Sequence, residues 1–107
     1  RRLSRVGVAG QVRSRLLHNP GELPSMPTIA DELHIDQRTL RRRLAAEGTS
    51  YRALLDEVRR QLALELLQQD LSVEEISRHL GYAETANFTH AFKRWEGTAP
   101  SYFRRPR

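Results

Sequence analysis

Residues 76–95 read ISRHLGYAETANFTHAFKRW, and a related stretch, IADELHIDQRTLRRRL, occupies residues 29–44. In each copy an isoleucine is followed four positions later by a leucine, and then by two apolar residues four apart. These are Leu40 and Leu44 in the first copy and Phe88 and Phe92 in the second. A short helix, a tight turn and a longer helix are therefore predicted twice, which is the pattern of a helix-turn-helix.

The turn between the two helices shows both the likeness and the difference of the copies. The isoleucines are 47 positions apart, whereas Leu40 and Phe88 are 48 apart, so the second turn holds one extra residue. Ala30 and Ser77 are small enough to let the helices cross closely. Gly81 stands where such a turn often needs a left-handed backbone, and His34 is expected to tolerate the same conformation in the first copy. A repeated helical hairpin without any nucleic-acid role has the same pattern, so the repeat alone leaves function open.

The flanking sequence in the first half is also predicted to be helical or to end helices. Val8, Val12 and Leu16 form an apolar stripe on a helix over residues 6–18, which Asn19-Pro20-Gly21 ends. Residues 23–27 are expected to form an extended loop. Thr28 is predicted to cap a short helix with Asp31 and Glu32 in its first turn, and Asp36 to cap a second helix that ends near Gly48.

In the second half, Ser50 is predicted to open the longest helix, which runs to about Gln69. Ser72 and Glu75 have the spacing of a capping box. A further helix is expected over about 84–96, ending at Gly97, and Pro100 begins a last short helix with Tyr102 and Phe103. The sequence predicts an all-α fold of about seven helices. Two helix-turn-helix subdomains, about 28–48 and about 73–97, are joined by a long linker helix at about 50–69.

The composition favours a polyanionic partner. The formal charge is +5 and the isoelectric point about 10.7, and Lys93 is the one basic residue among 18 that is not arginine. Arginine suits phosphates and guanine edges. The absence of cysteine excludes disulfides, thiolate zinc sites and cysteine nucleophiles. Apolar stretches are too short for a membrane span, and the chain starts without Met, so we expect a fragment of a longer protein.

On the outward face of the helix after Asp36, the only charged residues are arginines. With Leu40 and Leu44 inward, Arg38, Arg41, Arg42 and Ala45 share the opposite stripe. A solvated face would usually alternate charges, as Asp56-Glu57 and Arg59-Arg60 do on the central helix. The arginine stripe is therefore predicted to face an anion, although a solvated face remains the alternative.

On the second long helix, the predicted buried stripe consists of Phe88, Ala91, Phe92 and Trp95. The opposite face offers Asn87 and His90 for base edges and Ala86 for a thymine methyl, with Lys93 and Arg94 for phosphates. Thr85 begins the helix, where its hydroxyl and the backbone N–H groups can meet a phosphate or a base. His90 could instead be merely exposed, and it has no partner at metal-ligand spacing.

The linker helix has a length that matters for binding. Twenty residues of helix extend about 30 Å, and successive major-groove segments on one DNA face are about 34–36 Å apart. The two recognition helices are therefore predicted to enter adjacent groove segments, preferably of bent DNA.

These residues together resemble the C-terminal DNA-binding domain of the AraC/XylS family of bacterial transcription regulators. The resemblance spans about residues 28–104 and is strongest in Ile76-Ser77-Arg78-His79-Leu80-Gly81-Tyr82, Asn87-Phe88-Thr89-His90-Ala91-Phe92-Lys93-Arg94, Gly97-Thr98-Ala99-Pro100 and Tyr102-Phe103-Arg104. The family often has glycine in place of His34 and an aromatic residue in place of Leu44, departures that bear on packing rather than function.

The resemblance implies a set of DNA contacts, position by position. Base contacts fall on Arg38, Arg41, Arg42, Thr85, Ala86, Asn87 and His90. Backbone contacts fall on Thr39, Arg43, Thr89, Lys93 and Arg94. It implies double-stranded DNA as the partner and a cytoplasmic location. It also implies a separate effector or dimerisation domain that is absent from this fragment. Catalytic residues, metals and cofactors are not expected.

Two other classes of function, an enzyme and a protein-interaction module, compete with DNA binding. Related helical domains occur in DNA-repair methyltransferases, but those need a cysteine acceptor, and no G-x-S-x-G elbow supports a serine enzyme. We therefore expect no enzymatic activity. A helical protein-interaction module that docks on a transcription partner such as RNA polymerase, through the charged face of the central helix, stays open as the alternative or as a second role.

Overall fold

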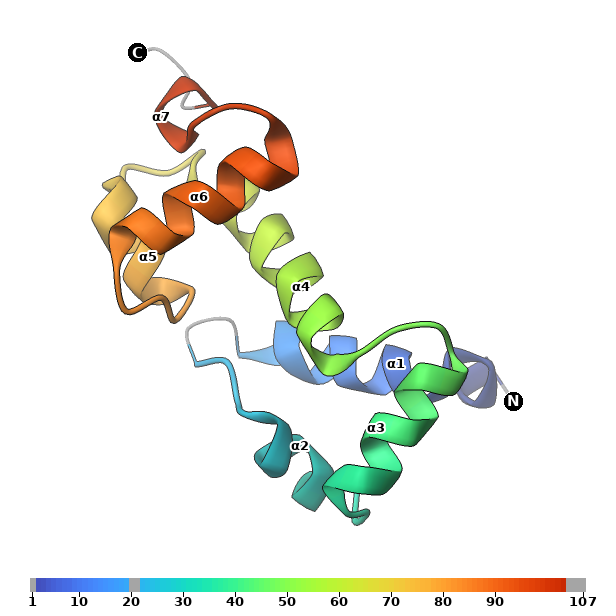
Figure 1. Cartoon of the computed structure of the whole chain (residues 1–107). Coiled ribbons are helices and arrows are strands. Elements are labelled where there is room, and N and C mark those ends of the chain that lie inside the picture. Colours follow the sequence, from blue (N-terminus) through green and yellow to red (C-terminus); the bar gives the residue numbers. More distant parts are fainter. Residues whose placement is uncertain (1, 20–21, 104–107) are drawn as a thin grey trace. The chain divides into compact units, whose positions relative to one another are not determined.

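A computed structural model describes residues 2–19 and 22–103, and this part of the chain is helical without any strand (Figure 1). Pro20, Gly21 and Arg104, which the sequence analysis named, lie outside the described residues. The all-α prediction is confirmed. The helices are α1 (Arg2–His18), α2 (Met26–Glu32), α3 (Gln37–Ala46), α4 (Tyr51–Leu66), α5 (Val73–His79), α6 (Thr85–Glu96) and α7 (Pro100–Phe103).

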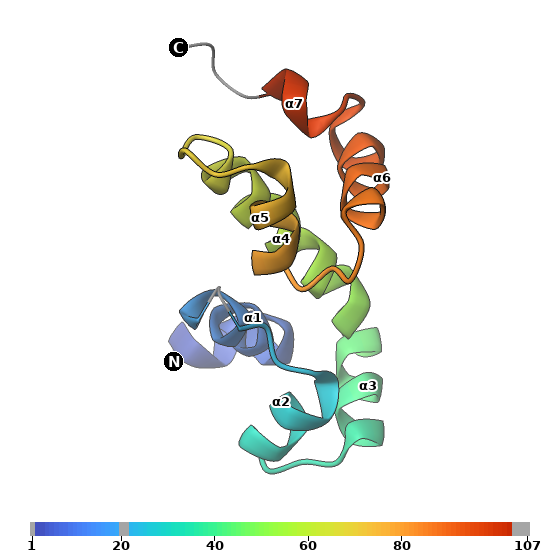
Figure 2. The same ribbon diagram turned by 90° about the vertical axis from the view of Figure 1, so that its left-hand side faces the viewer.

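The chain divides into two compact units, and α4 contributes to both. The first unit comprises residues 2–19 and 23–58, and the second comprises residue 22 and residues 59–103. Within the first, α3 packs on α1 and α2, and within the second, α6 packs on α5 and α7 (Figure 2). The core of the first consists of Val12, Leu16, Ile29, Ala30, Leu40, Leu44, Leu54 and Val58, and that of the second of Leu62, Ala63, Leu67, Ile76, Leu80, Phe88, Ala91 and Phe92.

The two helix-turn-helix turns begin in the same way. The N–H of Ile35 donates to the carbonyl of Ala30, and the N–H of Tyr82 donates to that of Ser77, each at 3.1 Å. His34 has a φ of 60° and Gly81 a φ of 86°. The predicted left-handed position is therefore confirmed in both copies, and Ala30 and Ser77 are buried as expected.

The start of α2 differs from the prediction. Thr28 does not cap this helix; Ser25 is the N-cap residue, and the N–H of Ile29 donates to its carbonyl at 3.1 Å. The prolines in residues 23–27 suggested a loop, but Pro27 lies in the first turn, where a missing N–H costs no hydrogen bond. Asp31 and Glu32 consequently lie at the end of α2 and not in its first turn.

The other caps agree with the prediction. Asp36 accepts a hydrogen bond from the N–H of Thr39 at 2.7 Å. Ser72 and Glu75 form the reciprocal capping box, with bonds of 3.0 and 2.8 Å. These side chains occupy N–H groups that an isolated helix end would leave without acceptors.

Two helices differ in length from the prediction. Instead of starting at residue 6, α1 begins at Arg2 and is interrupted at Gly7, where φ is 70°. Instead of running to Gln69, α4 ends at Leu66, because the N–H groups of Gln68 and Gln69 donate to carbonyls three residues back and tighten the chain into a turn. The 16 residues of α4 extend about 24 Å rather than about 30 Å.

Candidate nucleic-acid interface

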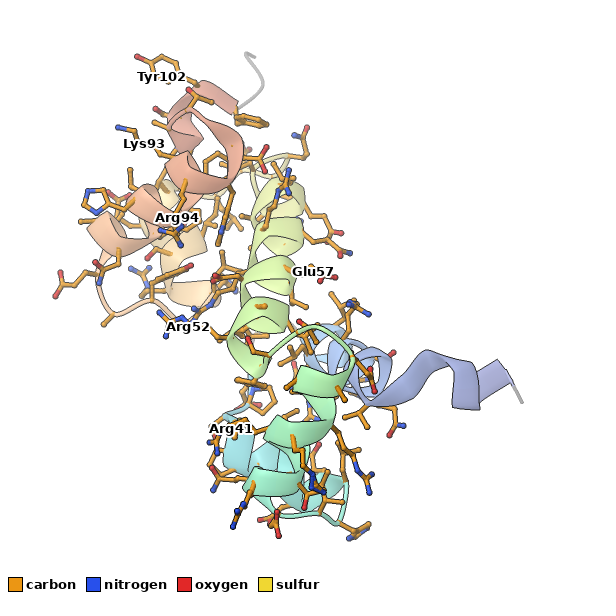
Figure 3. The ribbon with its side chains drawn as sticks, turned by 45° about the vertical axis from the view of Figure 1, so that its right-hand side comes forward. Arg41, Arg52, Glu57, Lys93, Arg94 and Tyr102 are labelled. Atoms are coloured by element: carbon orange, nitrogen blue, oxygen red, sulfur yellow. The ribbon has the colours of Figure 1, made fainter. Side chains whose placement is uncertain are left out.

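The arginines of α3 lie on its solvent face, in the predicted phase. Leu40 and Leu44 are fully buried. Arg41 projects away from the ribbon of α3 (Figure 3), while Thr39 is partly buried. The exposed side chains of this helix include Arg38, Arg41, Arg42, Arg43 and Ala45.

The corresponding face of α6 is mixed rather than purely basic. Phe88, Ala91 and Phe92 are buried, but Trp95, predicted to complete the stripe, is only partly buried at its edge. The opposite face exposes Ala86, Asn87, His90, Lys93 and Arg94, and Figure 3 shows Lys93 extending from the helix. Thr85 and Thr89 are partly buried beside them.

Ion pairing separates the arginines of this chain into two groups. Three arginines outside α3 are paired with carboxylates: Arg13 with Glu57 at 2.6 Å, Arg15 with Glu32 at 2.6 Å and Arg60 with Glu96 at 2.5 Å. Within residues 2–19 and 22–103, the four arginines of α3 form no ion pair. Like charges on one exposed face, here those of Arg38, Arg41 and Arg42, repel each other and therefore favour an opposing polyanion.

The N-terminal ends of the two candidate recognition helices are built differently. Hydrogen bonds from the backbone N–H and then the side chain of Thr39 lower the pKa of Asp36, and the charge of Arg42 adds to this effect. The cap thus keeps its negative charge and occupies both the N–H and the hydroxyl of Thr39. At α6 the N-cap residue is Glu84, whose side chain makes no capping bond. The N–H groups near Thr85 are consequently better placed than those of α3 to meet a phosphate.

The charged residues of α4 only partly form the solvated face that their alternating signs predict. Glu57 and Arg60 are exposed as expected, although both are in the ion pairs above. Arg59 is partly buried, and its Nε donates to the carbonyl of Leu80 at 2.8 Å. Its guanidinium carbon also lies 4.3 Å from the centre of the Tyr82 ring. Alternating charges indicate an exposed face and do not identify partners that are distant in the sequence.

The family profile described as helix-turn-helix domain matches residues 29–106. The chain belongs to the AraC/XylS-type helix-turn-helix family. A transcriptional regulator of the helix-turn-helix type from Mycobacterium tuberculosis is 50% identical over 102 residues, which are 94% of this chain and 30% of that protein. This AraC/XylS-type domain thus spans about 30% of the length of that curated relative.

Solved structures agree with this assignment. The transcriptional regulator CdpR from Pseudomonas aeruginosa is 41% identical, with a TM-score of 0.87 over 92% of this chain and 31% of that one. The DNA-binding domain of the global transcriptional factor AdpA, crystallised with a target DNA, is 25% identical, with a TM-score of 0.76 over 92% of this chain and 90% of that one. The AraC/XylS-type domain therefore shares its fold with a protein whose structure contains bound DNA.

Other types of site find no support in the described part of the AraC/XylS-type domain. No cluster of three or more histidine, aspartate or glutamate side chains there could hold a metal ion. Nor does any helix within residues 2–19 and 22–103 combine the length and apolar character needed to cross a bilayer.

Proposed function

We propose that this chain binds double-stranded DNA in a sequence-specific manner and regulates bacterial transcription, with α3 and α6 as its two recognition helices. The observation that carries the proposal is the unpaired row of exposed arginines on α3, in a helix-turn-helix whose second copy presents the exposed Asn87, His90, Lys93 and Arg94. Major grooves admit one helix each and present donors and acceptors that arginine and asparagine recognise.

Each exposed side chain has a proposed role. Arg38, Arg41 and Arg42 contact bases from α3, whereas Arg43 and Thr39 contact the DNA backbone. Thr85, Ala86, Asn87 and His90 contact bases from α6, and the backbone contacts there come from Thr89, Lys93 and Arg94. Arginine forks match guanine and asparagine matches adenine. The element recognised by α3 is therefore proposed to contain guanines, and that recognised by α6 an adenine.

The domain assignment is part of the proposal. One chain carries both helix-turn-helix units, about 28–48 and about 73–97, so the two can occupy adjacent major-groove segments of the same duplex without a second copy. A whole regulator would add an effector or dimerisation domain, and its place of action would be the bacterial cytoplasm, where the chromosome lies.

A selection of bound sequences from a pool of random duplexes tests this function directly. We expect two short enriched elements about one helical turn apart, because that is the spacing of adjacent groove segments on one DNA face. A single element, or a pool that stays random at physiological salt, would refute two-helix recognition.

Adjacent arginines of α3 provide a matched pair for the assigned roles. Arg42→Ala should relax preference at one base position and cost about 1–3 kcal/mol on the preferred duplex only. Arg43→Ala should weaken binding to all duplexes alike and reduce the slope of log affinity against log salt by about 0.9. Fluorescence anisotropy titrations between 50 and 200 mM salt, roughly the range over which such contacts are lost, measure both. Equal behaviour of the two variants would contradict the assignment.

A protein-interaction role through the charged face of α4 is not favoured. That interpretation requires Glu57 and Arg60 to be available to a protein partner. In this structure Glu57 is paired with Arg13, and Arg60 is paired with Glu96.

A further inference from the structure

One arginine outside the proposed DNA-binding face contacts the second helix-turn-helix at its turn. Arg59 of α4 donates its Nε–H to the carbonyl of Leu80 at 2.8 Å, and its guanidinium lies 4.3 Å from the centre of the Tyr82 ring. The contact is close, because a Cβ added to Gly81 would lie 3.3 Å from an Arg59 terminal nitrogen. The guanidinium therefore contacts Leu80 and Tyr82 and lies beside Gly81 between them.

The partners of Arg59 explain what this contact stabilises. Leu80 is the C-cap residue of α5, and carbonyls at a helix C-terminus lack intrahelical donors and favour a cation. A hydrogen bond from a charged donor is stronger than a neutral one. The Tyr82 ring in turn lies 5.6 Å from the ring of Phe88, centre to centre, and Phe88 is fully buried on α6. A side chain of α4 is thereby linked to α5 directly and to α6 through one ring.

The first helix-turn-helix secures its second helix in another way. There Asp36 caps α3 by accepting the Thr39 N–H at 2.7 Å. In the second copy, which has one more residue in its turn, the N-cap residue Glu84 makes no side-chain capping bond. The local device that fixes the start of α3 is thus missing at α6, and the contact from Arg59 lies at the turn where it is missing.

We propose that Arg59 is a positioning residue that fixes the orientation of α6 and thereby the base preference of that helix, without contacting DNA itself. This inference rests on the proposed function, since it concerns the specificity of the same interface. The guanidinium is the required group: it combines a fork of donors for the carbonyl with a flat face for the ring, and the lysine ammonium lacks that geometry.

The test compares Arg59→Gln and Arg59→Lys with the control Arg52→Gln. Arg52 is an exposed arginine of the same helix (Figure 3), so its variant loses the same charge. The half of the selected duplex that α6 contacts is first assigned as the half at which Asn87→Ala relaxes preference. Affinity ratios between matched and mismatched bases are then measured in each half, well below the melting temperature.

We expect Arg59→Gln to lose about tenfold or more of the discrimination in the α6 half, because one good base contact carries about that much. In Arg59→Gln, the discrimination in the half of the duplex that α3 contacts should stay unchanged. In the control Arg52→Gln, the discrimination in both halves should stay unchanged. Arg59→Lys should recover only part of the loss while restoring the charge. Full discrimination in Arg59→Gln, equal loss in both halves, or full recovery in Arg59→Lys would each overturn the proposal.

A second measurement keeps the inference testable without DNA. In the free protein, amide NMR shifts over residues 82–88 should change in Arg59→Gln and Arg59→Lys and stay unchanged in Arg52→Gln. Unchanged shifts in all three variants would overturn the positioning role even if DNA binding is confirmed. Changed shifts in a protein that selects no DNA sequence would instead refute the proposed function. If Arg59→Gln does not fold, Arg59→Lys carries both measurements.

Discussion

Removal of the Phe92 ring is expected to unfold the second unit and to leave helices of the first unit intact. The ring is fully buried. Its centre lies 5.3 Å from that of Phe103, 5.9 Å from that of Phe88 and 6.4 Å from that of Trp95. Phe92→Ala leaves a cavity between these three rings, and such substitutions cost about 3–5 kcal/mol.

The size of the unit decides what this cost does. Residues 59–103 form most of the second unit, and at about 0.05–0.15 kcal/mol per residue its stability is on the order of 2–7 kcal/mol. A loss of about 3–5 kcal/mol removes most of that free energy. We expect the unit to be largely unfolded at 25 °C in Phe92→Ala.

The single tryptophan of the chain makes the assay specific to one unit. Trp95 lies on α6, so its fluorescence reports the second unit, whereas far-UV circular dichroism reports all helices. In urea, Phe92→Ala should lose its fluorescence transition but keep part of the dichroism transition. Phe92→Leu, which leaves a smaller void, should shift the fluorescence midpoint only modestly. A Phe92→Ala protein whose fluorescence midpoint moves by the equivalent of less than about 1 kcal/mol would contradict the cavity calculation, and identical shifts of both probes would contradict independent units.

Further substitutions test three local features by urea unfolding: the left-handed turn, the Glu47 carboxylate and the capping box. His34→Gly should stabilise the first unit by roughly 0.5–1 kcal/mol, since the relief of left-handed strain exceeds the cost of the added conformational entropy of the unfolded chain. Gly81→Ala should destabilise the second unit, because it introduces the same strain. Opposite signs would refute the shared turn conformation. Glu47, whose pKa the N–H groups of Ala9 and Val8 lower, stabilises the fold above its unfolded pKa of about 4.3, and this contribution disappears as the pH falls through the lower folded pKa. Glu47→Gln should therefore be less stable than wild type at pH 7, with a gap that closes in acid; a gap independent of pH would exclude the carboxylate as its cause. Ser72→Ala should cost about 1 kcal/mol through loss of the capping box, and a cost near zero would show that the box is not formed.

Helical periodicity was sufficient to place the candidate interface. The side-chain phase of a helix is fixed at 100° per residue, so two buried leucines in α3 determine which arginines face solvent. Caps were predictable for the same reason: Asp36 and Ser72 bond to N–H groups three residues away in sequence. Features that depend on near neighbours in the chain could be derived from the sequence.

Features that depend on distant residues could not. The kink at Gly7 is accompanied by the Glu47 carboxylate, which accepts the N–H groups of Val8 and Ala9 at 2.9 Å each, across 39 and 38 positions. Gly7 has a φ of 70°, which favours glycine, and a Cβ there would also lie 2.8 Å from that carboxylate, a contact invisible in the sequence. The choice of Ser25 over Thr28 as N-cap was likewise undecided locally, because a proline is compatible with both a loop and a first helical turn.

The different uses of arginine explain why net charge is a weak guide to the interface. Arg13, Arg15 and Arg60 neutralise carboxylates of other helices, and Arg59 holds a turn; none of these needs DNA to satisfy its charge. The α3 arginines form no ion pair within the described residues, and their like charges repel each other in the folded protein. Replacement of Arg38 or Arg41 by glutamine should therefore leave the unfolding free energy unchanged or raise it, while Arg60→Gln should lower it. Residues retained at a cost to folding stability are expected at a binding face, so ion pairing identifies the arginines with a structural role better than composition does.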